Sequence, residues 1–390
     1  MEGHMQKDLV NKKSHLLECG ILLSLFVLSF ILRLSLYNVK HSDYFDFVLA
    51  FFTYLILRLK YTHSYVPIIG VAVILFTPTV FLNSAAWGQS DAIYTACCLG
   101  SLYFLLRESP AWACLCFGLA ISFKLQAIFF LPVLFVLLLT RKLPIKCLIL
   151  IPVIYLALLV PALLEGRDAW SLLTIYTGQA NEYPSLTMNA SNFYQWLPGA
   201  AFQDWRWTGI QLAAMMVALI SFLTVTSNKQ ITSGIIVKLT LVFALVLPFF
   251  LPQMQDHFFY LADVVSIIYA FYFPRYFYVA VLEQLCSLLS CVPFFFKTQV
   301  LSFAYIACVV LLLIVITLAD LVKTLYPTIQ MPVVVSDASS NDLSVMSFWL
   351  KVSFIKHKFQ AHFSVTESGT TDLPPVAADN FISPIQRRSD

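Results

Sequence analysis

The sequence predicts an all-α protein, a polytopic bundle of transmembrane helices. Hydrophobic residues make up 59% of the 390 positions and charged residues only 12%, whereas soluble domains carry about 25% charged residues. Apolar runs recur along the chain, and most approach the ~20 residues that a helix needs to cross a bilayer. Lysines and arginines cluster at alternate ends of these runs, which is the pattern that orients membrane helices. The net charge of +3 is too small to indicate nucleic-acid binding.

The first part of the chain supplies four predicted spans. Three lysines, Lys7, Lys12 and Lys13, precede the first span and predict a cytoplasmic N-terminus. Arg58 and Lys60 end the second span and predict its return to the cytoplasm. The four apolar runs are Leu16–Leu36, Phe45–Leu57, Val66–Leu82 and Ala92–Leu106.

The next apolar segment, Ala111–Thr140, is interrupted by the polar stretch Ser122–Gln126. Cationic residues flank both ends, so both ends are expected on the cytoplasmic side. The segment is therefore predicted to form two shorter helices, a re-entrant hairpin with Lys124 near its outer turn. A lysine at that depth requires protein or water around it.

Six further runs complete a predicted bundle of about ten spans plus the hairpin. The loop Glu165–Thr208 is predicted to lie outside. The composition changes to Ser, Asp, Thr and Pro from about Tyr326, which predicts a membrane domain over residues 1–325 and a mostly disordered cytoplasmic tail over 326–390. Within the tail, Val345–Phe359 is either an amphipathic segment on the inner leaflet or solvated chain. The six runs are Leu143–Leu164, Ile210–Thr226, Ile235–Leu251, Leu261–Phe273, Tyr276–Phe296 and Leu301–Val322.

The nine cysteines show no metal-ligand spacing with histidine, and several lie inside apolar runs. They are interpreted as inert core thiols. The 12 glycines form no glycine-rich phosphate loop. The sequence identifies no cofactor, and a divalent cation, Mg or Mn, is kept as a candidate.

Polar segments mark the predicted outer face. The topology gathers on that face Asp43, several aromatic residues and the cation Lys124. A carboxylate can act as a base, a cation can hold a phosphate, and an aromatic ring can stack on a sugar. These are the functions that glycosyl transfer from a lipid phosphate needs. The remaining candidate binding residues are Trp87, Gln89, Asp91, Gln126, Asn189, Asn192, Trp196, Asp256 and His257.

Four segments carry a resemblance to a known family: Asn83–Asp91, Ser122–Gln126, Asn189–Trp196 and Met254–Tyr260. They resemble bacterial membrane mannosyltransferase-like proteins related to the GPI mannosyltransferases, within the GT-C class of integral membrane glycosyltransferases. The resemblance extends over about Leu16–Val322. It implies a polyprenyl-phosphate sugar donor, transfer of mannose with inversion, a glycan or glycolipid acceptor, and a site on the outer face of the plasma membrane.

The resemblance also implies a catalytic aspartate in the first outer loop, and at the matching position stands Asp43. That loop is short here, because Tyr44 runs directly into Phe45, which resembles the start of the following span. Asp46 is interpreted as a helix residue that faces the interior, because carboxylates in membranes usually face a cavity or a partner.

Other interpretations stay open for these residues. Trp87 could instead belong to the aromatic belt at the membrane boundary, and Gln89 and Asp91 could cap the following helix. Lys124 could extend its side chain to the membrane surface, which is called snorkelling. His257 suits a hydrogen-bonded structural role. Asn189 begins a formal glycosylation sequon but is interpreted as a loop residue near the site.

Two other functions are compatible with the sequence. A lipid or sugar transporter or flippase would use broken helices as its path, although such proteins commonly carry paired breaks in two related halves. A non-catalytic remnant of the fold is the other alternative.

Overall fold

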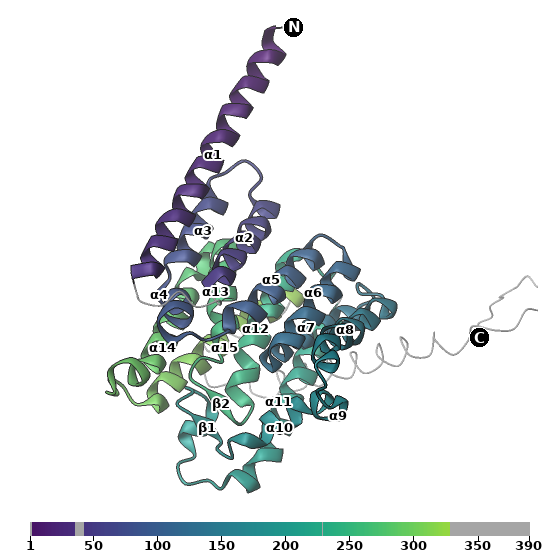
Figure 1. The fold of residues 1–390 in the computed structure, drawn as a ribbon, viewed down its shortest axis with the longest axis vertical. Helices are drawn as coiled ribbons and strands as arrows, with labels where there is room; N and C mark the ends of the chain where they lie inside the picture. Colours follow the sequence, from purple (N-terminus) through teal and green to yellow (C-terminus); the bar gives the residue numbers. More distant parts are fainter. Residues whose placement is uncertain (1, 36–42, 228, 328–390) are drawn as a thin grey trace, which may run out of the picture. The chain divides into compact units, whose positions relative to one another are not determined.

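The computed structural model describes residues 2–35, 43–227 and 229–327, and these form an all-α fold with one minimal pair of strands (Figure 1). The fold class is therefore as predicted. The strands are β1 (Thr187–Met188) and β2 (Met254–Gln255). The helices are α1 (Glu2–Ser35), α2 (Asp43–Lys60), α3 (Val66–Phe76), α4 (Pro78–Phe81), α5 (Asp91–Leu106), α6 (Pro110–Phe123), α7 (Leu131–Leu139), α8 (Leu150–Leu164), α9 (Ala169–Leu173), α10 (Ile175–Glu182), α11 (Phe202–Val225), α12 (Ser233–Phe250), α13 (Tyr260–Tyr272), α14 (Phe277–Phe296) and α15 (Phe303–Leu325).

Five helices in the described ranges are long and apolar enough to cross a membrane, or six if one bent pair counts as a span. Several other apolar helices are shorter, among them α13 with 13 residues. The structure thus supports a polytopic membrane protein, and the figure of about ten spans stays a prediction. The five are Ile145–Leu164, Phe202–Val225, Ser233–Phe250, Pro274–Phe296 and Phe303–Leu325.

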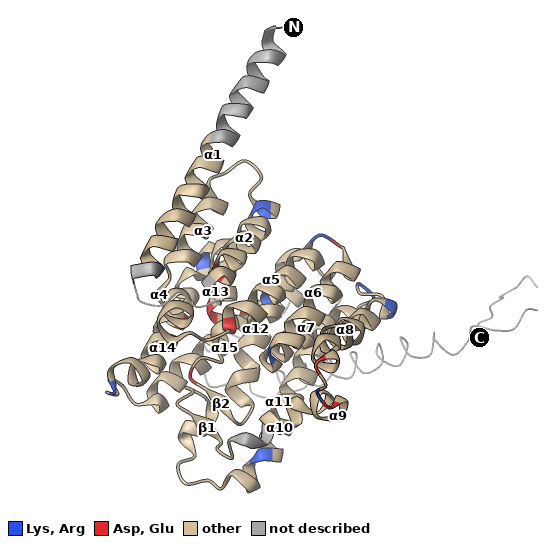
Figure 2. Ribbon diagram, in the orientation of Figure 1, with Lys and Arg blue, Asp and Glu red and all other residues tan. Residues whose placement is uncertain are grey.

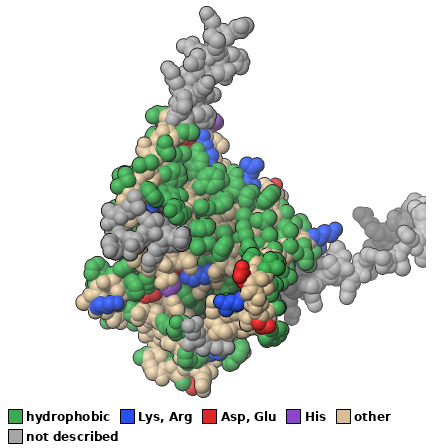
Figure 3. All heavy atoms as spheres, in the orientation of Figure 1, with side chains coloured by type: hydrophobic (Ala, Val, Ile, Leu, Met, Phe, Trp, Pro, Cys, Tyr) green, Lys and Arg blue, Asp and Glu red, His purple; other side chains and the backbone are tan. Residues whose placement is uncertain are grey.

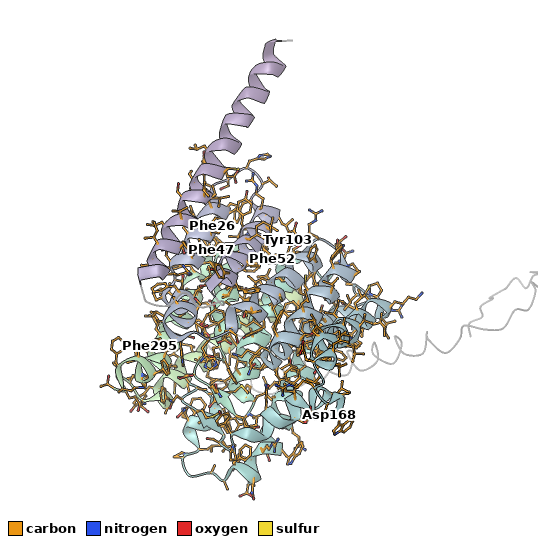
Figure 4. The ribbon with its side chains drawn as sticks, viewed as in Figure 1. Phe26, Phe47, Phe52, Tyr103, Asp168 and Phe295 are labelled. Atoms are coloured by element: carbon orange, nitrogen blue, oxygen red, sulfur yellow. The ribbon has the colours of Figure 1, made fainter. Side chains whose placement is uncertain are left out.

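The surface has the polarity expected of a protein in lipid. Hydrophobic side chains cover much of the face shown in Figure 3. Helix α8 buries none of its residues and leaves Leu164 82% exposed, which would be costly in water. Helix α12, in contrast, is buried along nearly its whole length. An aromatic pair joins α1 to α2, where the ring centres of Phe26 and Phe47 lie 5.5 Å apart (Figure 4).

The predicted span Val66–Leu82 is not one straight helix, because the chain bends by 47° between α3 and the segment Pro78–Trp87. The bent pair is apolar enough to count together as one broken span, so the crossing stays a prediction. Pro78 has no N–H to continue the α3 hydrogen bonds, and its ring clashes with the preceding turn. Beyond α4 the chain forms a π-helix, Leu82–Trp87. Such local widening is rare and often occurs at functional sites.

Arg33 stabilises this break. Its guanidinium donates to the carbonyl of Leu75, 3.3 Å away at the end of α3, and forms an ion pair of 2.9 Å with Asp46. Both charged side chains are fully buried. Ser84 of the π-helix donates to the same Asp46 carboxylate. The freed carbonyl thus has a donor inside the protein, as non-helical backbone at membrane depth requires, and Asp46 faces the interior as predicted.

The chain also breaks at Lys124, as predicted. Helix α6 ends at Phe123, Lys124 is extended with φ −153° and ψ 135°, and a 3₁₀ turn, Leu125–Phe130, leads into α7. Two short helices therefore flank the lysine. Their re-entrant path in a membrane stays a prediction, as does the domain boundary at 325/326, since residues 328–390 lie outside the described ones.

Candidate functional site

The site is organised around Asp91, the first residue of α5. The side chain of Asp91 is fully buried, and its Oδ1 lies 2.5 Å from Nζ of Lys124. Its Oδ2 accepts a hydrogen bond of 3.1 Å from Asn83 and lies 3.9 Å from Nε2 of His257. Charged residues are few on the described ribbon (Figure 2), so this convergence of three chain segments on one carboxylate is unusual for such an apolar protein.

His257 connects Asp91 to a second carboxylate. Its Nδ1 lies 3.0 Å from Oδ1 of Asp256, and its ring meets the edge of Trp87 with the ring centres 5.2 Å apart. Trp87 in turn stacks on Phe294 of α14 at 4.3 Å. The structure therefore brings five predicted residues together: Trp87, Asp91, Lys124, Asp256 and His257.

A pocket of about 100 Å³ opens beside this cluster. Its volume is enough for several water molecules, since one needs roughly 10–15 Å³ by the same kind of measure. Helices α13 and α14 form one side of it and the π-helix forms another. The lining residues are Thr79, Leu82, Asn83, Trp87, Asp256, His257, Tyr260, Asp263, Ser287, Leu288, Cys291, Val292, Phe295 and Phe296.

The predicted cap role of Asp91 is wrong. Ser90 is the N-cap of α5, and the Asp91 side chain points into the ion pair with Lys124. The negative charge in the first turn still interacts favourably with the helix dipole. Lys124 does not snorkel to an exposed position, because 18% of its side chain is exposed and its Nζ contacts the buried Asp91.

The loop between α10 and α11 docks on the segment that carries Asp256 and His257. Strands β1 and β2 pair in parallel, with Thr187 opposite Met254. Asn189 continues this contact through an isolated bridge to Gln255. Asn189 adopts φ 60°, a left-handed conformation that asparagine tolerates better than most residues. Two polar segments that lie far apart in the sequence are thus joined by backbone hydrogen bonds.

Asn192 and Trp196 anchor this loop and do not line the pocket. Asn192 is fully buried and accepts from the backbone N–H of Tyr194, while the Trp196 indole donates to the carbonyl of Ala304 in α15 at 3.0 Å. The Tyr194 hydroxyl donates to the carbonyl of Phe250 at 2.7 Å. Burial raises the pKa of Tyr194 to about 12, so the hydroxyl keeps its proton and remains a donor at neutral pH.

Three other predicted residues lie apart from the pocket or beyond description. Gln89 and Gln126 are half-buried, and neither lines the pocket. Asp43 is the first residue of α2, but its side chain lies outside the described residues, as do residues 36–42, which were predicted to form the first outer loop.

Sequence reasoning missed several pocket residues, among them Asn83, Tyr260, Asp263 and Ser287. A signal was present for Asp263, because it is an ionisable residue inside the apolar run Leu261–Phe273, and such residues mark functional sites by default. The same signal applied to Arg33, Lys238, Glu283 and Asp320, which are also buried.

No group of three or more His, Cys, Asp or Glu side chains in the described ranges could hold a metal ion. The nine cysteines all lie in those ranges and are free thiols. The question of a divalent cation stays open.

A comparison with protein-family models finds a match to glycosyltransferase family 87 over residues 45–271. The matched region is more than half of the chain and contains the whole Asp91 cluster. The chain belongs to glycosyltransferase family 87. No curated protein matches it. Family 87 membership and the apolar helices together identify a membrane glycosyltransferase, while the finer resemblance to GPI mannosyltransferases stays a prediction.

Proposed function

We propose that this family 87 member transfers a hexose, mannose, from a polyprenyl-phosphate donor to a glycan or glycolipid acceptor. The transfer inverts the anomeric centre and takes place on the outer face of the plasma membrane, with both termini in the cytoplasm. One observation carries the proposal: a lysine, a histidine, two carboxylates and a tryptophan from separate segments converge beside one pocket.

Lys124 and His257 are suited to the phosphate of the donor. The leaving lipid phosphate gains negative charge as its bond to the sugar breaks, and cations fixed in advance stabilise that charge. Asp91 holds Lys124 at 2.5 Å, and an ammonium group has three N–H donors. Two donors therefore remain for phosphate oxygens while the third keeps the lysine oriented.

The pocket also has an apolar side, formed by Leu288, Val292 and Phe295 of α14. An apolar wall next to cationic and hydroxyl-binding groups supports a ligand that carries both a lipid chain and a polar head. This combination favours a lipid-linked donor over a soluble nucleotide sugar.

Inverting transfer needs a carboxylate that takes the proton of the acceptor hydroxyl as its oxygen attacks the anomeric carbon. The resemblance assigns this role to Asp43. The described pocket offers Asp256, which His257 orients at 3.0 Å. Substitution of each aspartate by asparagine distinguishes the two assignments, because the residue that takes the proton is the one whose loss abolishes transfer.

The experiment uses the full chain in lipid vesicles, radiolabelled polyprenyl-phosphate mannose and a cell lipid extract. The native protein is expected to label a lipid or glycan product. Lys124→Ala should lower the rate by about 100-fold or more, the usual scale for a lost charge-stabilising group, and Lys124→Arg should retain part of it. Lys146→Ala, at a lysine remote from the pocket, is the matched control. Equal labelling by Lys124→Ala and the native protein would refute the proposal.

A flippase is the second candidate, and the bend at Thr77–Pro78 is the observation that favours it, because transporters use broken helices. Both breaks, at Thr77 and at Lys124, lie in the first half of the chain. Movement of a fluorescent polyprenyl phosphate between leaflets, without any labelled product, would support this alternative.

A further inference from the structure

Asp263 is a buried acidic residue in the lining of the same pocket. It belongs to the first turn of α13, lines the pocket and is 3% exposed. Its Oδ1 accepts a hydrogen bond of 2.6 Å from Ser287, and its backbone carbonyl accepts one of 2.9 Å from Gln284. Two contacts with α14 therefore fix the position of this carboxylate.

Asp263 differs from the other buried aspartates in its partners. Asp46 is paired with Arg33, Asp91 with Lys124, and Asp320 with Lys238. No lysine, arginine or histidine nitrogen of the described chain is recorded within 4.0 Å of Asp263. Its recorded side-chain partner is a neutral hydroxyl. The oxygens of such a carboxyl group can accept hydrogen bonds from neutral hydroxyl groups.

Two more pocket residues present buried polar atoms without a partner. The hydroxyl of Tyr260, on a side chain 2% exposed, has no hydrogen-bond partner among the described residues. The same is true of Oδ1 of Asn83, while Nδ2 of Asn83 donates to Asp91. Buried polar atoms are nearly always hydrogen-bonded in native proteins, so these two atoms in a pocket point to a polar ligand.

We propose that Asn83, Tyr260 and Asp263 form a subsite for the ring hydroxyls of the transferred sugar. A sugar hydroxyl both donates and accepts, which matches two acceptors, the Asn83 carbonyl and the Asp263 carboxylate, and one hydroxyl that does both. Trp87 in the same pocket offers an aromatic surface. This inference rests on the proposed function, and it orients the donor with its phosphate toward Lys124 and its sugar toward α13.

The test measures transfer from polyprenyl-phosphate mannose and from its four monodeoxy analogues, which lack the 2-, 3-, 4- or 6-hydroxyl. Asp263→Asn should lower kcat/KM for the parent donor by roughly 10- to 100-fold, the range for a lost hydrogen bond that leaves a buried polar partner unsatisfied. For the analogue that lacks the hydroxyl bound by Asp263, the substitution should change kcat/KM less than 3-fold, because that contact is already absent. Tyr260→Phe removes only a hydroxyl and provides a variant of minimal structural effect.

Two controls separate binding from structure. Asp320→Asn changes a buried carboxylate that pairs with Lys238 and does not line the pocket. This variant should keep the native preference among the five donors. Polyprenyl phosphate without a sugar should inhibit the native protein and Asp263→Asn equally, because the subsite contacts only the sugar.

Each outcome decides one point. No transfer by the native protein from any donor would overturn the proposed function itself. Transfer by the native protein with unchanged kcat/KM in both Asp263→Asn and Tyr260→Phe would overturn the subsite and leave the proposed function intact. Weaker inhibition of Asp263→Asn by the sugar-free lipid, or an equal effect of Asp320→Asn on the preference among donors, would show a structural role and also overturn it.

Discussion

Two buried charge clusters, one around Asp91 and one around Lys238, differ in how completely their polar atoms are satisfied. Lys238 of α12 lies 2.7 Å from Asp320 and donates to Thr324 at 2.7 Å. Asp320 also accepts from the Tyr269 hydroxyl at 2.7 Å, and the Lys238 ammonium lies 4.3 Å from the centre of the Phe273 ring. Only 6% of the Lys238 side chain is exposed, so this cluster is closed.

The Asp91 cluster has an ion pair of similar length, but it borders a pocket and leaves 18% of the Lys124 side chain exposed. A charge inside an apolar chain therefore does not mark a ligand site by itself. A ligand site is indicated by a charged group that still has hydrogen-bond donors or acceptors without a partner in the protein. The following predictions test this distinction, from the largest expected effect to the smallest.

Removal of the Lys238 ammonium group from its pair with Asp320 should lower stability and leave the rate of transfer unchanged. Lys238→Met leaves Asp320 buried without its cation, which costs about 3–5 kcal/mol in the free energy of unfolding. Thermal unfolding in detergent measures this loss, and the transfer rate per folded molecule should stay at the native level. The double variant Lys238→Met with Asp320→Leu should recover most of the stability. A catalytic loss in that stable double variant would break the comparison.

The open cluster should respond in the opposite way. Asp91→Asn keeps the shape of the side chain but removes the charge that holds Lys124, so the rate of transfer should fall by about 10-fold or more, the scale of a misplaced catalytic group. Steady-state kinetics on the native protein and this variant measure the fall. The matched control is Asp320→Asn in the closed cluster, and an equal fall in kcat there would contradict the distinction.

The packing around the site should also depend on the loop between α10 and α11, which β1 and β2 join to the segment of Asp256 and His257. A methyl group on Gly209 would lie 1.8 Å from the Tyr194 hydroxyl, so Gly209→Ala should displace Tyr194 from the carbonyl of Phe250. The expected cost is about 1–3 kcal/mol, the range for overpacking. Thermal unfolding checks it, and Gly178→Ala, at a glycine with open space around it, is the control. Equal unfolding temperatures for the two variants would contradict the expectation.

The smallest effect is expected at the loop's contact with α15. Trp196→Phe keeps an aromatic ring but loses the hydrogen bond to the carbonyl of Ala304, which should cost about 1 kcal/mol. Chemical unfolding of the two proteins gives the difference. A change in the donor preference of this variant would show that Trp196 contacts substrate, as the sequence suggested, and not only the scaffold.

Much of the fold could be predicted because the bilayer imposes simple rules on a sequence. Apolar runs of sufficient length predict helices, and the ends of α12, α14 and α15 lie within a few residues of the predicted spans. The break at Lys124 was also predictable, because a polar stretch interrupts an apolar run. The bend at Pro78 could have been predicted from proline's missing N–H, but the uninterrupted hydropathy of Val66–Leu82 favoured a single helix.

The site could be predicted only in part. Five site residues stood out because they lie at the ends of apolar runs or, for Lys124, interrupt one, and polar residues are conspicuous there. The other four are Trp87, Asp91, Asp256 and His257. Asn83 and Tyr260 did not stand out, since asparagine and tyrosine are ordinary residues near membrane boundaries. Their importance depends on which atoms around them are already hydrogen-bonded.

The sequence by itself determined that this is a helical membrane protein, and it located the segments from which the site is built. Only the tertiary structure decided which charges neutralise one another and which remain available, because Asp91 meets Lys124 and His257 across long intervals of sequence. The physical reason is that hydropathy is a property of each segment along the chain. Satisfaction of a buried polar atom depends on whichever segments pack against it, and for Asp263 and Lys238 these are other helices.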